Sequence, residues 1–394
     1  MISNRPVRIL CVFGTRPEAI KVAPIILAAR QRSDVEVIVC SSGQHREMLD
    51  QVISYFGIPP HVELNLMQQG QSLTGLASRC LDALGRTIEE YRPDAVLGQG
   101  DTTTAMCAGM VAFFNQLPFI HVEAGLRTDD IRSPFPEELN RRVCSLVSTL
   151  HCAPTQTAAD NLLHEGYASN DVVVTGNTVI DALHWTVQKE RADAHVWMQK
   201  HPELTHNRMV LITAHRRENH GSGIRQLCQA IRTLASGFPN VQFVYPVHLN
   251  PNIQQPVRET LSDLANVKLM APAEYPEFVW LMDQASLIVT DSGGVQEEAP
   301  SLRKPVLVTR ESTERPEALA AGATRLVGTD PDRIVAAVSD LLTNKDAYAQ
   351  MQISSSPYGD GRASERILDL AVQRLNGRRP HHTAVLEHAL PATR

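Results

Sequence analysis

Residues 286–308 read SLIVTDSGGVQEEAPSLRKPVLV, and this stretch predicts how the second half of the chain folds. An apolar run ends at Thr290, a turn of small and polar residues follows at 291–294, and a helix is expected to open there. A second apolar run comes next, at 305–308. The order strand, helix, strand is typical of a parallel sheet covered by helices on both faces.

Apolar runs of the same kind recur along the chain between longer amphipathic segments. In the first half they are VRILCVF, VEVIVC, DAVLGQ, PFIHVEA, LHCAP and DVVVTG, and in the second half MVLITAH, VQFVYPVH, VKLMA, SLIVTD, PVLVTR and TRLVG. A polar, helix-prone stretch after Asp181 separates the two sets, which places a boundary within 175–208. We therefore predict an α/β protein of two Rossmann-like, doubly wound domains that face a cleft, at 1–180 and 181–375, with a flexible tail at 376–394.

Composition limits the classes of function. A chain of 394 residues with 43% hydrophobic and 20% charged residues is long enough for two globular domains. Its net charge of −6 argues against a general nucleic-acid or anionic-membrane binder. The 7 cysteines form no CxxC pair, which favours reduced and buried thiols. With no signal-like or membrane-spanning stretch in view, we expect a cytoplasmic protein without nucleic-acid or membrane partners.

The turn at 291–294 predicts an anion site. Backbone N–H groups at Ser292, Gly293 and Gly294 would lie at the positive end of the following helix, where a phosphate fits. A simple helix cap is the alternative. Glu297 and Glu298 just inside the helix favour a nucleotide, because one carboxylate could hold a ribose diol while the phosphate rests on the turn.

The segment GTRPEAIK at 14–21 has the same design in the first half of the chain. Helix capping accounts for its threonine, proline and glutamate. It does not account for Arg16, whose planar fork suits a phosphate, or for Lys21 about one turn further on. Two solvated surface cations are the alternative.

A third anion-compatible loop, TAHRRENHGSG, occupies 213–223 and offers His215, Arg216 and Arg217. His215 and His220 are five residues apart, which misses the helical zinc spacing, so we predict no metal site. The positive side chains of this loop are better suited to contact a diphosphate than to bind zinc.

Carboxylates follow two of the first-half strands and open a later helix. Asp101 lies in GQGDTTT, Glu123 lies in HVEAGLRT, and Glu137 precedes Glu138 in SPFPEELNRR. Adjacent parallel strands end side by side, so Asp101 and Glu123 should face one cleft and could serve as acid and base. For Asp101 an N-cap role is the alternative. GQGDTT has only two glycines of the dinucleotide fingerprint, so NAD is not expected, and no cofactor is predicted.

These motifs, taken in order, resemble the bacterial non-hydrolysing UDP-N-acetylglucosamine 2-epimerase family over nearly the whole chain. The segments that carry the resemblance are VFGTRPEAIK, GQHREML, GQGDTTT, HVEAGLRT, PFPEELNRR, VTGNTVID, TAHRREN, PVHLNP, TDSGGVQEEAPSL and TERPEAL. The resemblance implies a glycosyltransferase-B-like fold, a homodimer, and interconversion of UDP-N-acetylglucosamine and UDP-N-acetylmannosamine for surface polysaccharide synthesis.

The resemblance also implies roles for individual residues. Uracil would stack on an aromatic side chain, the second-half turn would hold phosphate, cations would contact the diphosphate, and the acids would be catalytic. The residues at the matching positions are Phe278 for uracil, Ser292 and Gly293 for phosphate, Glu298 for ribose, Arg16 and His215 for the diphosphate, and Asp101, Glu123 and Glu137 for catalysis. Family members can bind a second UDP-N-acetylglucosamine beside the active site, and Gln44, Arg46 and His248 lie in the matching motifs.

The reaction that the resemblance implies suggests a role for Arg16 and Lys21. The hydrogen on sugar carbon 2 is too weakly acidic for a carboxylate to remove directly. Loss of UDP from the anomeric carbon acidifies that hydrogen, so elimination gives 2-acetamidoglucal, which takes UDP back with the opposite configuration. Arg16, with help from Lys21, would stabilise the charge on the departing diphosphate.

Three other functions use much of the same scaffold. A hydrolysing epimerase would release UDP and free N-acetylmannosamine, a glycosyltransferase would need an acceptor, and a nucleotide-sugar sensor would bind without turnover. A sensor would have no use for Asp101, Glu123 and Glu137, so these acids favour an enzyme.

Overall fold

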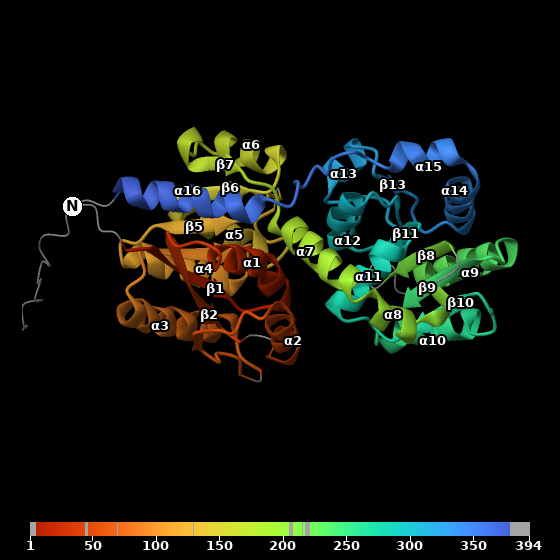
Figure 1. The fold of residues 1–394 in the computed structure, drawn as a ribbon, viewed down its shortest axis with the longest axis horizontal. Helices are drawn as coiled ribbons and strands as arrows, with labels where there is room; N and C mark the ends of the chain where they lie inside the picture. Colours follow the sequence, from red (N-terminus) through yellow and green to blue (C-terminus); the bar gives the residue numbers. More distant parts are fainter. Residues whose placement is uncertain are drawn as a thin grey trace, which may run out of the picture.

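The computed structural model describes residues 5–378, apart from 44–45, 69, 129, 205–207, 215 and 217–220. Two parallel sheets, each with helices on both faces, form two lobes that lie side by side (Figure 1). The predicted fold class is therefore confirmed. None of the helices in the described part of the chain is both long and apolar enough to cross a bilayer.

The first lobe is built on a seven-stranded sheet in the order β3-β2-β1-β4-β5-β6-β7. Every neighbouring pair is parallel, and β1 is an interior strand, where Cys11 pairs with Val39 of β2 on one side and Leu97 of β4 on the other. The first-lobe strands are β1 (Val7–Phe13), β2 (Val35–Ser41), β3 (Val62–Glu63), β4 (Ala95–Gln99), β5 (Phe119–Val122), β6 (Leu150–Ala153) and β7 (Val172–Val174). The two-residue β3 was not among the predicted runs; it extends the sheet beyond β2.

Helices alternate with these strands, as the sequence predicts. They are α1 (Arg16–Ala29), α2 (Arg46–Phe56), α3 (Leu73–Tyr91), α4 (Thr103–Phe114), α5 (Glu137–Val147), α6 (Gln156–His164) and the short η1 (Ser169–Asp171). Their apolar faces make separate cores with the two faces of the sheet, one around Ile25 and Leu97 and the other around Leu10 and Val96. The 7 cysteines are buried and unpaired within these lobes.

The second lobe repeats the scheme with a six-stranded parallel sheet in the order β10-β9-β8-β11-β12-β13. Its strands are β8 (Arg208–Thr213), β9 (Val241–Pro246), β10 (Val267–Met270), β11 (Leu287–Thr290), β12 (Val306–Val308) and β13 (Thr324–Leu326). Its helices are α8 (Ala194–Lys200), η2 (Pro202–Leu204), α9 (Ser222–Gly237), α10 (Pro251–Leu261), α11 (Tyr275–Gln284), α12 (Gly293–Glu298), η4 (Ala299–Leu302), α13 (Pro316–Ala320), α14 (Pro331–Thr343) and α15 (Lys345–Met351).

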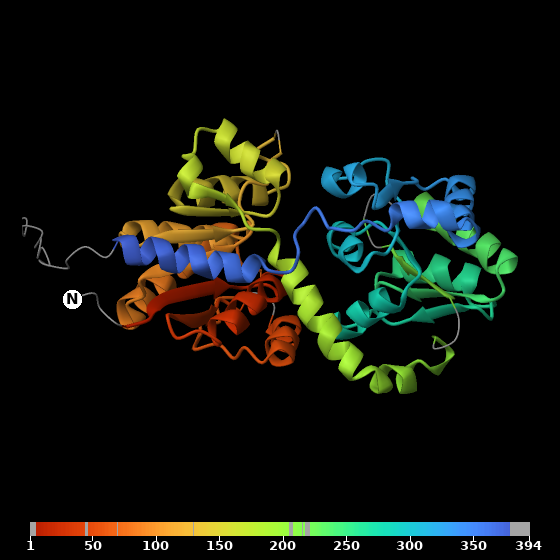
Figure 2. The same cartoon turned by 45° about the horizontal axis from the view of Figure 1, so that its top comes forward.

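The chain crosses between the lobes twice. Helix α7 (Thr178–Ala192) carries it across and packs against α1 of the first lobe and α11 of the second. After α15 it returns, and α16 (Ala363–Arg378) lies against α1 and β1 of the first lobe (Figure 2). The prediction had assigned 181–375 to the second domain and did not include this return. Residues 379–394 of the predicted tail lie outside the described part of the chain.

Backbone contacts join the two crossings. The N–H of Asn177, just before α7, donates to the carbonyl of Tyr358 at 2.7 Å. The carboxylate of Asp181 accepts from the N–H groups of Ala363 and Ser364 at 3.2 and 2.7 Å, and so caps the start of α16. Hydrogen bonds therefore tie the two crossings to each other.

Candidate active site

A cavity of about 850 Å³ lies between the lobes, at the carboxyl ends of both central strands. Its walls come from the start of α1, from α2 and α7, and from α11, α12 and the loop before α13 in the second lobe. The lining residues are Thr15, Arg16, Pro17, Ile20, Lys21, Met48, Val179, Thr213, Ala214, Pro246, His248, Pro272, Ala273, Tyr275, Phe278, Ser292, Gly294, Val295, Glu297, Glu298 and Arg315. This is the place where open α/β sheets bind ligands.

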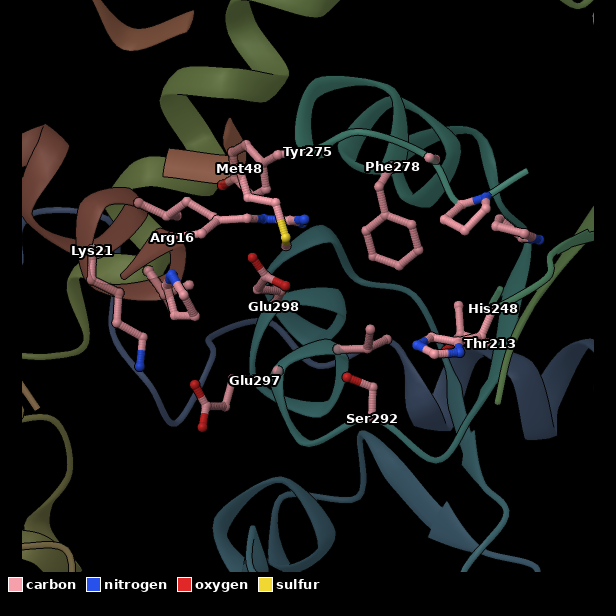
Figure 3. A pocket seen from close by; sticks show the side chains of 18 of the residues that line it. Arg16, Lys21, Met48, Thr213, His248, Tyr275, Phe278, Ser292, Glu297 and Glu298 are labelled. Atoms are coloured by element: carbon pink, nitrogen blue, oxygen red, sulfur yellow. The ribbon is translucent and has the colours of Figure 1, made fainter. Parts of the chain in front are cut away.

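The start of α1 places Arg16 at the cavity. Glu18, one turn inside, accepts hydrogen bonds from the N–H groups of Gly14 and Thr15 at 3.0 and 2.8 Å. It also accepts from the hydroxyl of Thr102 at 2.7 Å. Burial raises the pKa of Glu18 although these hydrogen bonds oppose the shift. Glu18 therefore fixes the turn while Arg16 extends into the cavity (Figure 3).

Lys21 connects the cavity to the first-lobe acids. Its Nζ lies 2.5 Å from Oε2 of Glu123, which also accepts from the side chain of Gln99. Burial lowers the pKa of Lys21, but the negative charges of Glu123 and Glu297 outweigh that effect, so the pKa is raised. Glu123 has a φ of 63°, a left-handed conformation that is uncommon for a residue other than glycine. The structure thus holds Lys21 charged between carboxylates of both lobes.

Asp101 lies close to this pair. Its carboxylate is 2.5 Å from the guanidinium of Arg141, and its carbonyl accepts from the amide of Asn140 at 2.9 Å. Burial raises the pKa of Asp101, Arg141 opposes the shift, and the charge of Glu123 adds to it. Asp101 and Glu123 therefore interact electrostatically, as expected for the ends of the adjacent strands β4 and β5.

The three predicted acids differ in how near they come to the cavity. Asp101, Glu123 and Glu137 are not among the residues that line it. Glu123 reaches it through Lys21, and Asp101 stands next to Glu123. Glu137 is the first residue of α5 and is half-exposed. The structure brings Asp101, Glu123 and Lys21 together and leaves Glu137 on the neighbouring helix start.

The second-lobe turn has the predicted form. Ser292 is the N-cap of α12, and its N–H donates to the Thr290 hydroxyl at 2.9 Å. That hydroxyl is 2.5 Å from the hydroxyl of Thr213 at the end of β8. Ser292 and Gly294 line the cavity, and Gly293 opens the helix between them. The ends of β8 and β11 thus support one another directly below the helix start.

Two adjacent glutamates on α12 have different surroundings. Glu297 pairs with Arg315 and accepts from the amide of Asn177 at 3.3 Å. Glu298 faces Arg16 across the cavity (Figure 3). Burial and the charge of Glu297 raise the pKa of Glu298 to about 8, against the opposing effects of Lys21 and Arg16. Glu298 therefore holds its proton more tightly than a solvated glutamate does.

An aromatic wall completes the second-lobe side. The ring of Phe278 on α11 projects into the cavity opposite Ser292 (Figure 3). Tyr275, one turn earlier, is buried and lines the same space. A flat ring beside a helix start can hold a base while the N–H groups hold its phosphates.

Other predicted residues fall partly outside what the structure describes. Gln44 and His215 lie outside the described residues, and Arg46 opens α2 with a side chain that is not described. His248 lines the cavity, and its Nδ1 accepts from the N–H of Asn250 at 3.1 Å. Within the described residues no group of three or more His, Cys, Asp or Glu side chains is placed to hold a metal ion.

Sequence reasoning missed Arg315. Burial lowers its pKa, but the charge and hydrogen bond of Glu297, together with the charge of Glu123, outweigh burial and raise the pKa overall. A signal was available: the tetrapeptide Arg-Pro-Glu-Ala occurs at 16–19 and again at 315–318, each time at the start of a helix. The repetition marks a second helix start whose arginine reaches the same cavity as Arg16.

Comparisons with known proteins agree over most of the chain. The family described as UDP-N-acetylglucosamine 2-epimerase matches residues 27–371. The UDP-N-acetylglucosamine 2-epimerases of Salmonella typhimurium and Escherichia coli K12 are 50% and 48% identical to this chain, over 92% of it and 97% of each relative. A crystal structure of the Neisseria meningitidis UDP-GlcNAc 2-epimerase bound to UDP-GlcNAc is 46% identical, with a TM-score of 0.84 over 93% of this chain and 100% of that one. The chain belongs to the UDP-N-acetylglucosamine 2-epimerase family.

Proposed function

We propose that the chain catalyses the reversible 2-epimerisation of UDP-N-acetylglucosamine to UDP-N-acetylmannosamine. The observation that carries the proposal is the cavity in which helix starts from both lobes converge, with Arg16, Lys21 and Arg315 facing buried carboxylates. The family membership and the Neisseria relative bound to UDP-GlcNAc support the choice of substrate.

The second lobe would hold the UDP part of the substrate. Phe278 offers a flat face for uracil, and the N–H groups from Ser292 to Gly294 offer donors for phosphate. Glu298 lines the same cavity and is suited to the ribose hydroxyls. Because its pKa is raised to about 8, it can both donate and accept a hydrogen bond at neutral pH.

The cations would act on the bond that breaks. When the bond between the anomeric carbon and the diphosphate oxygen breaks, both electrons leave with UDP and negative charge builds on the diphosphate. Arg16 extends into the cavity from the first lobe, where it can stabilise that charge, with His215 as the second predicted group. Loss of the proton from carbon 2 then completes 2-acetamidoglucal. Re-addition of UDP to carbon 1 with its original configuration, and of a proton to carbon 2 on the opposite face, gives the epimer.

The first lobe would handle the proton. Inversion needs a group on each face of carbon 2, and Asp101, Glu123 and Glu137 are the candidates. The raised pKa of Asp101 makes its carboxyl group a better proton carrier than a solvated aspartate. Lys21, bonded to Glu123, would hold that carboxylate in a fixed position.

We further propose that a second UDP-N-acetylglucosamine binds beside the substrate near Gln44, Arg46 and His248. His248 lines the cavity, which supports this placement. Addition of UDP-N-acetylglucosamine should then raise the initial rate in the mannosamine direction. Hyperbolic kinetics without any effect of added UDP-N-acetylglucosamine would count against this regulation.

The setting we propose is the cytoplasm, where a homodimer would supply UDP-N-acetylmannosamine for surface polysaccharide synthesis. The buried, unpaired cysteines support a reducing compartment. Sedimentation of the purified protein would test the dimer, since a single species of one-chain mass contradicts it.

Proton NMR in deuterated water, with UDP-N-acetylglucosamine and without added metal or NAD, tests the reaction. UDP-N-acetylmannosamine that carries deuterium at sugar carbon 2 is the expected product. Free N-acetylmannosamine with UDP would move the assignment to the hydrolysing class. An unchanged substrate spectrum from folded, UDP-binding protein would favour a transferase or a sensor.

A further inference from the structure

A second groove lies at the crossing between the lobes and shares no lining residue with the substrate cavity. It consists of two adjoining cavities of about 460 and 510 Å³ that have His184, Ser301 and Arg303 in common. We call it the hinge groove. Its walls come from the ends of β6 and β7 in the first lobe, from η4 and residues 354–357 in the second, and from α7.

Helix α7 separates the two sites. Val179 on this helix lines the substrate cavity. His184, Gln188 and Arg191 line the hinge groove, and their spacing places them in one stripe along the helix. The hinge groove is therefore a distinct site on the element that joins the lobes.

Some charged side chains of the hinge groove form ion pairs and one does not. Arg366 holds Asp360 with two hydrogen bonds of 2.8 and 2.7 Å, and Arg191 holds Asp283 with two of 2.8 and 2.7 Å. Arg303 is exposed, and within the described part of the chain its guanidinium has neither a hydrogen bond nor an ion pair. The groove thus contains one arginine whose charge has no counterpart there.

The backbone at Arg303 supports a role for its side chain. This residue follows η4 with a φ of 56°, a conformation that favours glycine. An arginine here accepts backbone strain and places a five-donor fork over the groove. The N–H of Arg303 donates to the carbonyls of Ala299 and Pro300, so this conformation is the C-cap of η4, and the described contacts leave the guanidinium available to a ligand.

Hydroxyl groups stand around the same space. Ser301 Oγ is buried and has no hydrogen-bond partner among the described atoms. Ser354 and Ser355 line the groove on the second-lobe side, and His184 lies across from them on α7. Asp360 is the one acid among the described lining residues, and Arg366 already binds it.

From this arrangement we propose that the hinge groove binds a phosphate group, with Arg303 as its principal ligand and Ser301 and His184 as further donors. A planar guanidinium and several hydroxyls are the donor set that phosphate oxygens take. A cavity of about 460 Å³ has room for more than inorganic phosphate, so a small phosphomonoester fits as well. Such an anion would touch both lobes at the crossing.

Isothermal titration of the full-length protein, saturated with UDP and kept at constant ionic strength, tests the proposal. The probes are inorganic phosphate and glucose 6-phosphate, with glucose as the neutral control. We expect saturable binding of a phosphate probe, at least tenfold weaker in R303Q and in R303G. R303G removes the guanidinium while giving the backbone the residue it favours, so it should fold at least as well as the wild type.

R258Q is the matched control, because Arg258 is an exposed arginine on α10 that does not line the groove. It should bind phosphate like the wild type. Tighter binding of glucose 6-phosphate would identify an organic phosphate as the ligand, and equal binding would identify the phosphate group alone. Unchanged affinity in R303Q, an equal loss in R258Q, or no saturable binding of either phosphate probe to the UDP-saturated protein would overturn the proposal.

Discussion

The same four residues, Arg-Pro-Glu-Ala, start a helix in each lobe, but their side chains make different contacts in the two lobes. At 16–19 the glutamate is buried and holds its own turn together through Gly14 and Thr15. At 315–318 the glutamate is half-buried and its carboxylate accepts a hydrogen bond from Thr155 of the other lobe, at 3.0 Å. One segment braces a lobe from within, and the other connects the two lobes.

The arginines of the two segments differ in the same way. Arg16 extends into the cavity near Glu298, whereas Arg315 is bound to Glu297. An arginine already paired with a buried carboxylate has less of its charge to offer a ligand. The Arg-Pro-Glu-Ala motif therefore determines where each helix begins, and the residues that the rest of the fold places around it determine which contacts its side chains make.

The largest effect should come from Arg16. R16A removes a cation aimed at the leaving diphosphate, so we expect kcat to fall by about 10²–10³-fold, the usual cost of losing one transition-state donor. Turnover is measured by NMR, and the Tm should stay close to that of the wild type. R30A is the control, because Arg30 ends the same helix and donates to the carbonyl of Gly57. Near-normal turnover in R16A would remove Arg16 from the mechanism.

The two glutamates should differ in stability. E18A leaves buried donors at Gly14, Thr15 and Thr102 without their acceptor, so it should lower the free energy of unfolding by about 2–3 kcal/mol. E317A removes one contact at the edge of the lobes and should cost less than about 1 kcal/mol. Urea unfolding of both variants checks the difference, and equal losses would mean that the two segments are equivalent.

A pH dependence should separate Glu298 from the other carboxylates. Its pKa in the folded, unliganded protein is about 8, above the ordinary value of 4.5, so the folded state holds the proton more tightly than the unfolded chain. The stabilisation from this proton is complete below pH 4.5 and is lost as the pH rises through 8. Between these values the free energy of unfolding should fall by up to about 1.4 kcal/mol per pH unit relative to E298Q.

Urea unfolding of wild type and E298Q from pH 5.5 to 8.5 measures that slope. Arg16 opposes the rise in the pKa of Glu298, so R16A should move the titration to higher pH. A difference in the free energy of unfolding between wild type and E298Q that does not change with pH would show that the pKa of Glu298 is not raised. Glu298 could then not donate a hydrogen bond to the ribose at neutral pH, as we propose.

Local sequence patterns predicted the fold and the helix starts because strands, turns and helix caps depend mainly on consecutive residues. Apolar runs such as VRILCVF became the central strands, and the turns before α1 and α12 placed Arg16 and Ser292 in one cavity. The return of α16 to the first lobe could not be predicted, because its docking depends on Asp181 and on the surface of α1 far away in sequence. The pairing of Glu297 with Arg315 and the left-handed backbone of Glu123 depend likewise on contacts that only the assembled lobes create.

The smallest effect concerns the hydrogen bond between Thr155 and Glu317. Thr155 also caps α6 by accepting from the N–H of Ala158 at 3.2 Å, so T155V alone loses both the cap and the contact between lobes. T155V removes the cap whether or not Glu317 is present, so the free energy of the cap cancels in a double-mutant cycle of T155V and E317A. The cycle therefore isolates the free energy of the contact between Thr155 and Glu317. We expect a coupling free energy of about 0.5–1 kcal/mol from urea unfolding, because the pair is partly exposed. A coupling of zero would mean that the second Arg-Pro-Glu-Ala segment positions Arg315 but contributes nothing to holding the lobes together, and the comparison would then rest on the arginines alone.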